Sequence, residues 1–147
     1  MLKRVKLKIE SAIDNLSPAG LVEGDTEKST TECLGSLRIG DGIISVTYTE
    51  QSEGGEIRSE IFCCDGTVRV RRSGAIESDM YFKEGEIHTS VYSIPPYSFD
   101  AAVKAKRVRI DVNEMGGSID LLYNMRIGGA EKSARMKIWI LHSSSQN

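Results

Sequence analysis

The sequence predicts an all-β fold, a single antiparallel up-and-down β-barrel of about ten strands. Apolar and polar residues alternate along most of the chain, as at Val5, Leu7 and Ile9, which are interleaved with lysines. No stretch has the period of a helix. Turn residues recur at fairly even spacing, at Gly40-Asp41-Gly42, Gly54-Gly55, Asp65-Gly66, Ser73-Gly74, Glu84-Gly85, Gly116-Gly117 and Gly128-Gly129.

All of 1–147 is expected to form one domain, because a chain of 147 residues is long enough for one sizeable core. Short connections favour antiparallel neighbours, and so many strands would close into a barrel to remove their edges. The longest connection, 14–28, is predicted to be a polar loop at one barrel mouth. The expected strands are 2–13, 29–39, 43–50, 57–63, 67–72, 78–82, 87–94, 99–112, 118–127 and 132–141.

The eighth expected strand breaks the alternation. Its apolar residues are odd-numbered over 99–105 and even-numbered over 108–112, so we predict a β-bulge near Lys106 and Arg107 that bends the strand. The preceding turn contains Pro95-Pro96. Because proline cannot donate to a sheet ladder, this pair should end the seventh strand, stiffen the turn and hold Tyr97 at the mouth.

Charge and cysteine content limit the classes of partner. The 19 lysines and arginines nearly balance the 21 acidic residues, so no global field attracts nucleic acid or an anionic membrane. No stretch is apolar and long enough for a signal peptide or a membrane span, and no membrane partner is expected. Three cysteines fit a reducing compartment better than a disulfide framework. These features favour a cytoplasmic location.

No residue pattern points to a catalytic group, a metal or a cofactor. His88 and His142 lie far apart without a further ligand at a suitable spacing. Cys63 and Cys64 should point to opposite faces of a strand, which disfavours a disulfide or a shared metal. No phosphate loop opens a helix, and nothing identifies a nucleophile. A non-catalytic function is therefore favoured over an enzyme.

A candidate binding site comes from combining alternation with strand direction. Odd-numbered strands of the meander end at one mouth, where Tyr48, Glu50, Arg72 and Tyr92 should project inward and Tyr97 should stand on the turn. A charged residue with core-facing parity is unusual unless it is paired or functional. Two interpretations follow: Glu50 and Arg72 pair as a structural plug, or Arg72 binds a ligand whose walls are the tyrosines.

The outer face offers a second set of candidates. Trp139, Leu122 and Leu141 have outward parity on two consecutive strands, and we predict that they form an exposed apolar patch suited to a homodimer. A solvated face is favoured over RNA or DNA binding for the outward basic residues, because most aromatic residues point inward. These basic residues are Arg4, Lys6, Lys8, Arg69, Arg71, Lys104, Lys106, Arg107 and Arg109.

Two long stretches, RRSGAIESDMYFKEGEIHTSVYSIPPYSFDAAVKAKRVRIDV (71–112) and GGSIDLLYNMRIGG (116–129), resemble the uncharacterised YwiB-like family of small bacterial proteins. The resemblance covers nearly the whole chain and rests on spaced strand and turn residues. It implies a calycin-type, lipocalin-like barrel with a lumen or mouth, and a domain of unknown function. It implies no reaction.

Two functional hypotheses follow from these observations. In the first, the chain is a non-catalytic cytoplasmic barrel that binds a small anionic or amphipathic ligand at its open mouth, with Arg72 as the charge partner and 14–28 as a lid. In the alternative, the barrel is filled and serves as an interaction module that binds protein or RNA through its outer face. A cavity inside the barrel would favour the first hypothesis.

Overall fold

The computed structural model describes residues 1–142 and consists of ten antiparallel strands. No helix occurs among these residues, and so none that could cross a membrane. The strands are β1 (Leu2–Leu16), β2 (Val22–Gly40), β3 (Ile43–Ser52), β4 (Gly55–Cys64), β5 (Thr67–Gly74), β6 (Ser78–Phe82), β7 (Ile87–Ile94), β8 (Tyr97–Asn113), β9 (Gly116–Ile127) and β10 (Ala130–His142).

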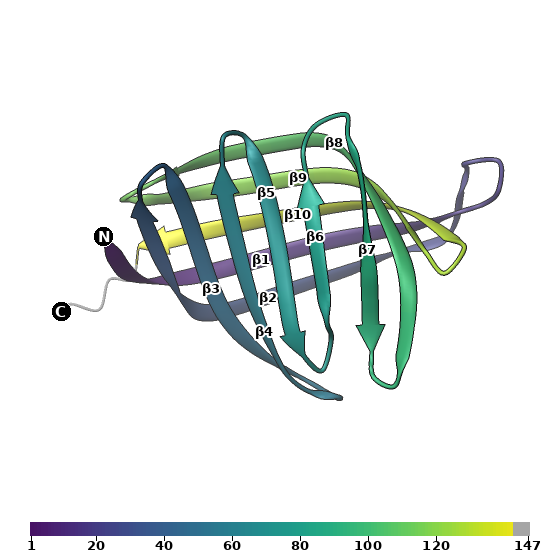
Figure 1. Cartoon of the computed structure of the whole chain (residues 1–147), viewed down its shortest axis with the longest axis horizontal. Helices are drawn as coiled ribbons and strands as arrows, with labels where there is room; N and C mark the ends of the chain where they lie inside the picture. Colours follow the sequence, from purple (N-terminus) through teal and green to yellow (C-terminus); the bar gives the residue numbers. More distant parts are fainter. Residues whose placement is uncertain (143–147) are drawn as a thin grey trace.

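The strands form one sheet that curls into a nearly closed barrel (Figure 1). Consecutive strands pair with each other except β6 and β7, and β1 also pairs with β10, so the sheet order is β6-β5-β4-β3-β2-β1-β10-β9-β8-β7. The remaining seam lies between β6 and β7. A single bridge crosses it, in which the amides of Glu77 and Ser93 donate to each other's carbonyl oxygens, both at 2.8 Å. The predicted all-β barrel is confirmed.

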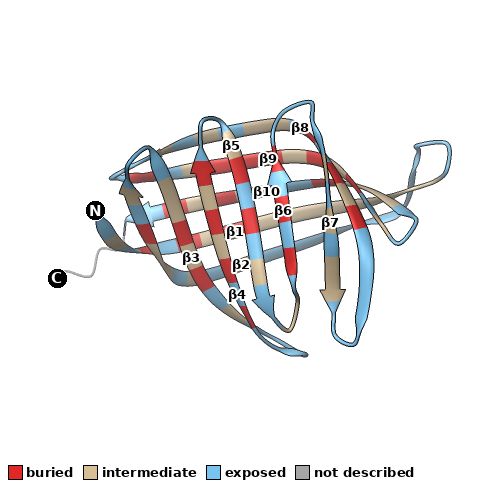
Figure 2. Cartoon of the chain, viewed as in Figure 1, coloured by how far each residue is buried: buried red, intermediate tan, exposed pale blue. Residues whose placement is uncertain are grey.

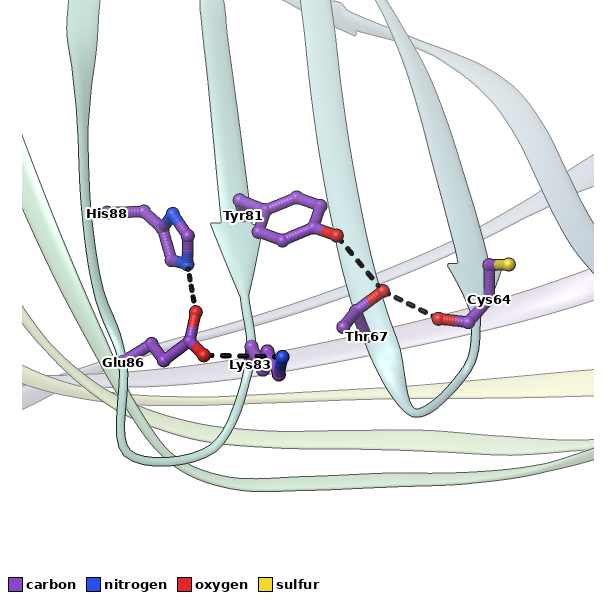
Figure 3. Close-up of polar contacts among 6 residues, drawn as sticks. All are labelled: Cys64, Thr67, Tyr81, Lys83, Glu86 and His88. Atoms are coloured by element: carbon purple, nitrogen blue, oxygen red, sulfur yellow. Dashed lines mark hydrogen bonds and ion pairs between the residues drawn. The ribbon is translucent and has the colours of Figure 1, made fainter.

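Side chains hold the seam at the end away from this bridge (Figure 3). The rings of Tyr81 and His88 meet edge to face with centroids 4.9 Å apart. The Tyr81 hydroxyl donates to Thr67 Oγ1 at 3.3 Å, and Glu86 accepts from His88 at 3.0 Å and pairs with Lys83 at 3.3 Å. The ring contact joins β6 to β7 directly, and the Lys83–Glu86 pair lies in the turn between them, so these two contacts hold the seam where it has no ladder.

Buried residues recur along the strands (Figure 2), and those that are hydrophobic form one core. Alternate residues of each strand point inward, and cross-strand pairs line up as rows around the wall. One such row lies across β2 to β6 and is at most 4% exposed, which gives each side chain about 1.5 to 3 kcal/mol from burial. Its members are Leu37, Val46, Ile61, Val70 and Met80.

Local features of the sequence appear where they were predicted. The pairing of β8 with β9 shifts by one residue between Ala105 and Arg107, which confirms the predicted bulge. Asp65 and Gly66 form a two-residue turn with φ of 51° and 75°, as Asp-Gly hairpins require. Pro95 and Pro96 form the turn that ends β7 and precedes β8, as expected.

The prediction of a long polar loop over 14–28 is wrong. β1 continues to Leu16 and β2 begins at Val22, so the connection is only residues 17–21. The paired ends project beyond the other strands (Figure 1). From Val22 to Thr30 every residue of β2 is exposed. A hairpin with solvent on both sides has no buried face, so the alternation that reveals a strand is absent.

Candidate functional site

The barrel mouth contains a cavity of about 520 Å³. This volume lies within the range of about 300 to 1,000 Å³ typical of small-molecule sites. Side chains from every strand except β4 line it: Ile9, Ser11, Ile13, Ser29, Thr31, Tyr48, Glu50, Arg72, Met80, Tyr92, Ile94, Phe99, Tyr123, Met125, Ile127, Gly128, Lys132 and Met136.

A row of polar side chains crosses β3 to β6 directly above the apolar core row. The register pairs Tyr48 with Ser59, Ser59 with Arg72, and Arg72 with Ser78. Each of these side chains points inward because it lies two positions along its strand from an inward-facing core residue, as Arg72 does from Val70. The next row toward the rim contains Glu50. We call Tyr48, Ser59, Arg72 and Ser78 the polar row.

The polar row is deeply buried and incompletely hydrogen-bonded. Tyr48 is 4% exposed, Ser59 0% and Ser78 7%, while Arg72 is half-buried. Ser59 Oγ, Ser78 Oγ and Arg72 Nε find no hydrogen-bond partner among the described residues. Buried polar atoms are nearly always paired in folded proteins, and an unpaired one costs about 1 to 3 kcal/mol. Of the four residues, Tyr48 and Arg72 line the cavity, so these two can contact a bound polar group.

Two buried tyrosines stand around Arg72. Burial raises the pKa of the Tyr48 hydroxyl, and the positive charge of Arg72 offsets part of that rise. Burial also raises the pKa of Tyr123, again with Arg72 opposing and with Tyr92 adding to the rise. Tyr123 is held by Phe82, whose ring lies edge to face with a centroid distance of 4.8 Å. Both phenols are therefore neutral hydrogen-bond donors at physiological pH.

Three charged residues line the cavity, namely Glu50, Arg72 and Lys132. None of the three takes part in an ion pair among residues 1–142. The predicted structural plug, a pair between Glu50 and Arg72, is thus not formed. The charge of Glu50 adds to burial in raising the pKa of the nearby Cys33 thiol.

The opposite wall of the cavity, on β9 and β10, is mainly apolar. Met125 and Met136 are buried beside Tyr123, and Ile127 follows Met125 toward the rim on β9. Lys132, the cross-strand partner of Met125, is the charged residue of this wall. At the rim, Phe99 is 40% exposed. The flexible methionines thus lie opposite the guanidinium of Arg72.

Four of the five predicted site residues come together as expected: Tyr48, Glu50, Arg72 and Tyr92 all line the cavity. Tyr97 does not, because the two-residue turn leaves it 66% exposed on the outside of the rim. Tyr123 and Lys132 also line the cavity, although no sequence pattern pointed to them. Tyr123 points inward like the core residues of β9, and only its depth in the barrel distinguishes a site residue from a core residue.

Among residues 1–142, no three histidine, cysteine or acidic side chains lie close enough together to hold a metal ion. Cys63 is buried and Cys64 exposed, which confirms that they point to opposite faces. Burial raises the pKa of the Cys63 thiol to about 12, so it stays protonated.

The predicted apolar patch on the outer face is interrupted by charge. Leu141 is exposed, but Leu122 does not lie beside Trp139 on the neighbouring strand. Leu122 pairs with Arg135, whereas Trp139 pairs with Ser118, four residues away along β9. Lys8 and Lys137 also lie over the Trp139 ring, at 5.4 and 5.0 Å from its centroid. The prediction that the three apolar residues form one patch is therefore wrong.

Comparisons with known proteins agree with this architecture. A sequence profile of the domain of unknown function DUF1934 matches residues 19–140. The uncharacterised β-barrel protein YwiB of Bacillus subtilis (strain 168) is 21% identical over 128 residues, which are 87% of this chain and 85% of that protein. The crystal structure of the Bacillus subtilis ywiB protein superposes with a TM-score of 0.84 at 20% identity, covering 97% of this chain and 94% of the other. The chain therefore belongs to the DUF1934 family, a β-barrel family of unknown function.

Proposed function

We propose that this protein is a non-catalytic binding protein that takes a small anionic, amphipathic molecule into the mouth of its barrel. The observation that carries the proposal is that Arg72 lines a cavity of about 520 Å³ and forms no ion pair among residues 1–142. A guanidinium with free donors is suited to a carboxylate or a similar acid.

The other walls support an amphipathic ligand. Met125, Met136 and Ile127 provide apolar surface opposite Arg72. Neutral phenols and serine hydroxyls orient a polar group without adding charge. In this proposal the lining residues bind the ligand and orient it.

A fluorescent anionic probe, 8-anilinonaphthalene-1-sulfonate, tests this proposal directly. Removing a hydrogen bond to a charged group costs about 1.5 to 3 kcal/mol, so Arg72→Met should weaken binding roughly 10- to 150-fold. Arg71→Met is the matched control, because Arg71 is the preceding residue of β5 and points outward. Thermal melting of both variants checks that the fold is retained. Equal probe affinity for the two variants would contradict the proposal.

We place this function in the cytoplasm. Cys33, Cys63 and Cys64 are free thiols, and no pair of them is bridged. Such a set suits a reducing compartment.

The alternative, a filled barrel that binds protein or RNA through its outer face, has less support. The barrel holds a cavity, and Lys8 and Lys137 cover the Trp139 ring that would stack on a base.

A further inference from the structure

We infer that the ligand of this cavity is a monocarboxylate that binds with its acid group innermost, against the polar row, and its apolar body toward the rim. The inference rests on the proposed function and adds to it the chemical class and the orientation of the ligand. Four independent features of the site lead to it: the converging donors, the depth of the row, the net charge and the apolar wall.

Two donors of the polar row, Arg72 and Tyr48, line the cavity. Both are cross-strand neighbours of Ser59 in the same row, so their side chains point into the barrel at the same level. A carboxylate has two oxygens that accept about four hydrogen bonds in one plane, which suits a guanidinium beside a neutral phenol.

The depth of the row fixes the orientation. Immediately below it lies the packed core row, where Val46, Ile61 and Val70 are all 0% exposed. A ligand cannot extend past that row. The row above it holds Glu50 and leads to the exposed rim at Phe99 and Ile94. An acid group that reaches Arg72 must therefore be the innermost part of the ligand.

The charge of the cavity favours a single negative charge. Arg72 and Lys132 contribute two positive charges and Glu50 one negative charge, which leaves a net charge of +1. One carboxylate balances this charge. A phosphate monoester carries about −1.5 to −2 at pH 7 and would leave the site negative, with Glu50 nearby and no second guanidinium.

The apolar wall suits an extended or flat apolar body. Met125 and Met136 are unbranched and adapt to the shape that they contact, and both are at most 8% exposed. Phe99 and Ile127 continue the apolar surface to the rim. A chain or ring attached to the acid would lie along these residues and emerge beside them.

Calorimetry with probes that differ only in their head group tests the ligand class. We expect dodecanoate to bind at least about tenfold more tightly than dodecanol and than dodecyl phosphate, all below their critical micelle concentrations. Arg72→Met should remove that preference, and Arg72→Lys should restore part of it, because a lysine keeps the charge and loses the planar edge. Arg71→Met should keep the preference.

The orientation is tested on the unaltered protein with dodecanoate labelled with ¹³C at its carboxyl carbon. If the acid is innermost, the bound carboxyl stays ionised to a lower pH than in water, and its resonance is insensitive to a paramagnetic relaxation agent in the solvent. A bound carboxyl that titrates as in water and is relaxed by the agent would overturn the inferred orientation.

The outcomes separate this inference from the proposed function. If dodecanol and dodecyl phosphate bind as tightly as dodecanoate, the cavity is a binding site but the inferred ligand class is wrong. If 8-anilinonaphthalene-1-sulfonate binds but dodecanoate does not, the inferred class is also wrong. If none of these probes binds, the proposed function fails.

Discussion

Single residues decide whether a polar position in this barrel contributes to binding or to stability. Arg72 points into the barrel, lines the cavity and forms no ion pair among residues 1–142. Arg135, on the outer face, donates to both carboxylate oxygens of Asp120, at 3.3 and 3.0 Å. The two arginines thus have different roles that follow from what each finds opposite its guanidinium.

The Asp120–Arg135 pair leads to a prediction about acid stability. Partial burial raises the pKa of Asp120, but the hydrogen bonds and charge of Arg135 outweigh it and lower the pKa overall. A lowered pKa in the folded state means stability that is present above the ordinary aspartate value of about 3.9 and lost as the pH falls through the lowered pKa. Asp120→Asn should cost about 1 kcal/mol at pH 7 and flatten the loss below pH 4, measured by urea unfolding.

Asp79 is the control for this prediction. It also pairs with an arginine, Arg69, at 2.6 Å, but both side chains are more than 40% exposed. Solvent screens such a pair, so Asp79→Asn should change stability by less than about 0.5 kcal/mol. A wild type and an Asp120→Asn variant with the same pH profile would show that Arg135 contributes nothing.

At the scale of the strand, the bulge in β8 bends the strand and leaves the ladder with β9 regular on both sides of it. Without Lys106 the ladder would run regularly from Ala105 to Arg107, and every inward residue would keep its face. Deleting Lys106 should therefore remove the bend and leave the pairing intact. We expect a loss of roughly 1 to 3 kcal/mol, measured by thermal unfolding, with an unchanged circular dichroism spectrum at low temperature.

Deleting Ala102 is the matched control, because it lies in the regular part of the same strand. That deletion would turn one segment of β8 inside out, which a one-residue slip always does. It should be much more damaging than deletion of Lys106. Equal damage from the two deletions would mean that the bulge does not act as a bend.

Elements with one buried face were the ones that the sequence could predict. The alternation of apolar and polar residues predicted all ten strands. It also predicted the position of the bulge, because apolar residues that change from odd to even positions within one strand require an extra residue there. The projecting ends of β1 and β2 were missed because solvent covers both faces of Val22 to Thr30.

The site was predictable in part for a related reason. Alternation placed Tyr48, Glu50, Arg72 and Tyr92 inside the barrel. It could not tell how deep the packed core extends, so Ser59 and Tyr123 were indistinguishable from core residues. That depth depends on how side chains from many strands fill the lumen, which no local pattern contains.

At the scale of the whole molecule, the outer face bears on self-association. A stable dimer through Trp139 would need a continuous apolar surface, but Lys8, Lys137 and Arg135 lie around it. We now expect wild type and Trp139→Ala alike to be monomers of 16.2 kDa by light scattering at high micromolar concentration. A dimer that Trp139→Ala disrupts would instead support the homodimer predicted from the sequence.

The order of strands in the sheet has a consequence for folding kinetics. The pairing of β1 with β10 is the one ladder between strands far apart in the chain described by residues 1–142. Joining the two termini and opening the chain at 83–86, in the turn between β6 and β7, would give a circular permutant in which every ladder joins consecutive strands. Folding speeds up as contacts become more local, so this permutant should refold severalfold faster than the parent in stopped-flow experiments. A permutant that refolds no faster than the parent would show that the β1–β10 ladder forms after the rate-limiting step.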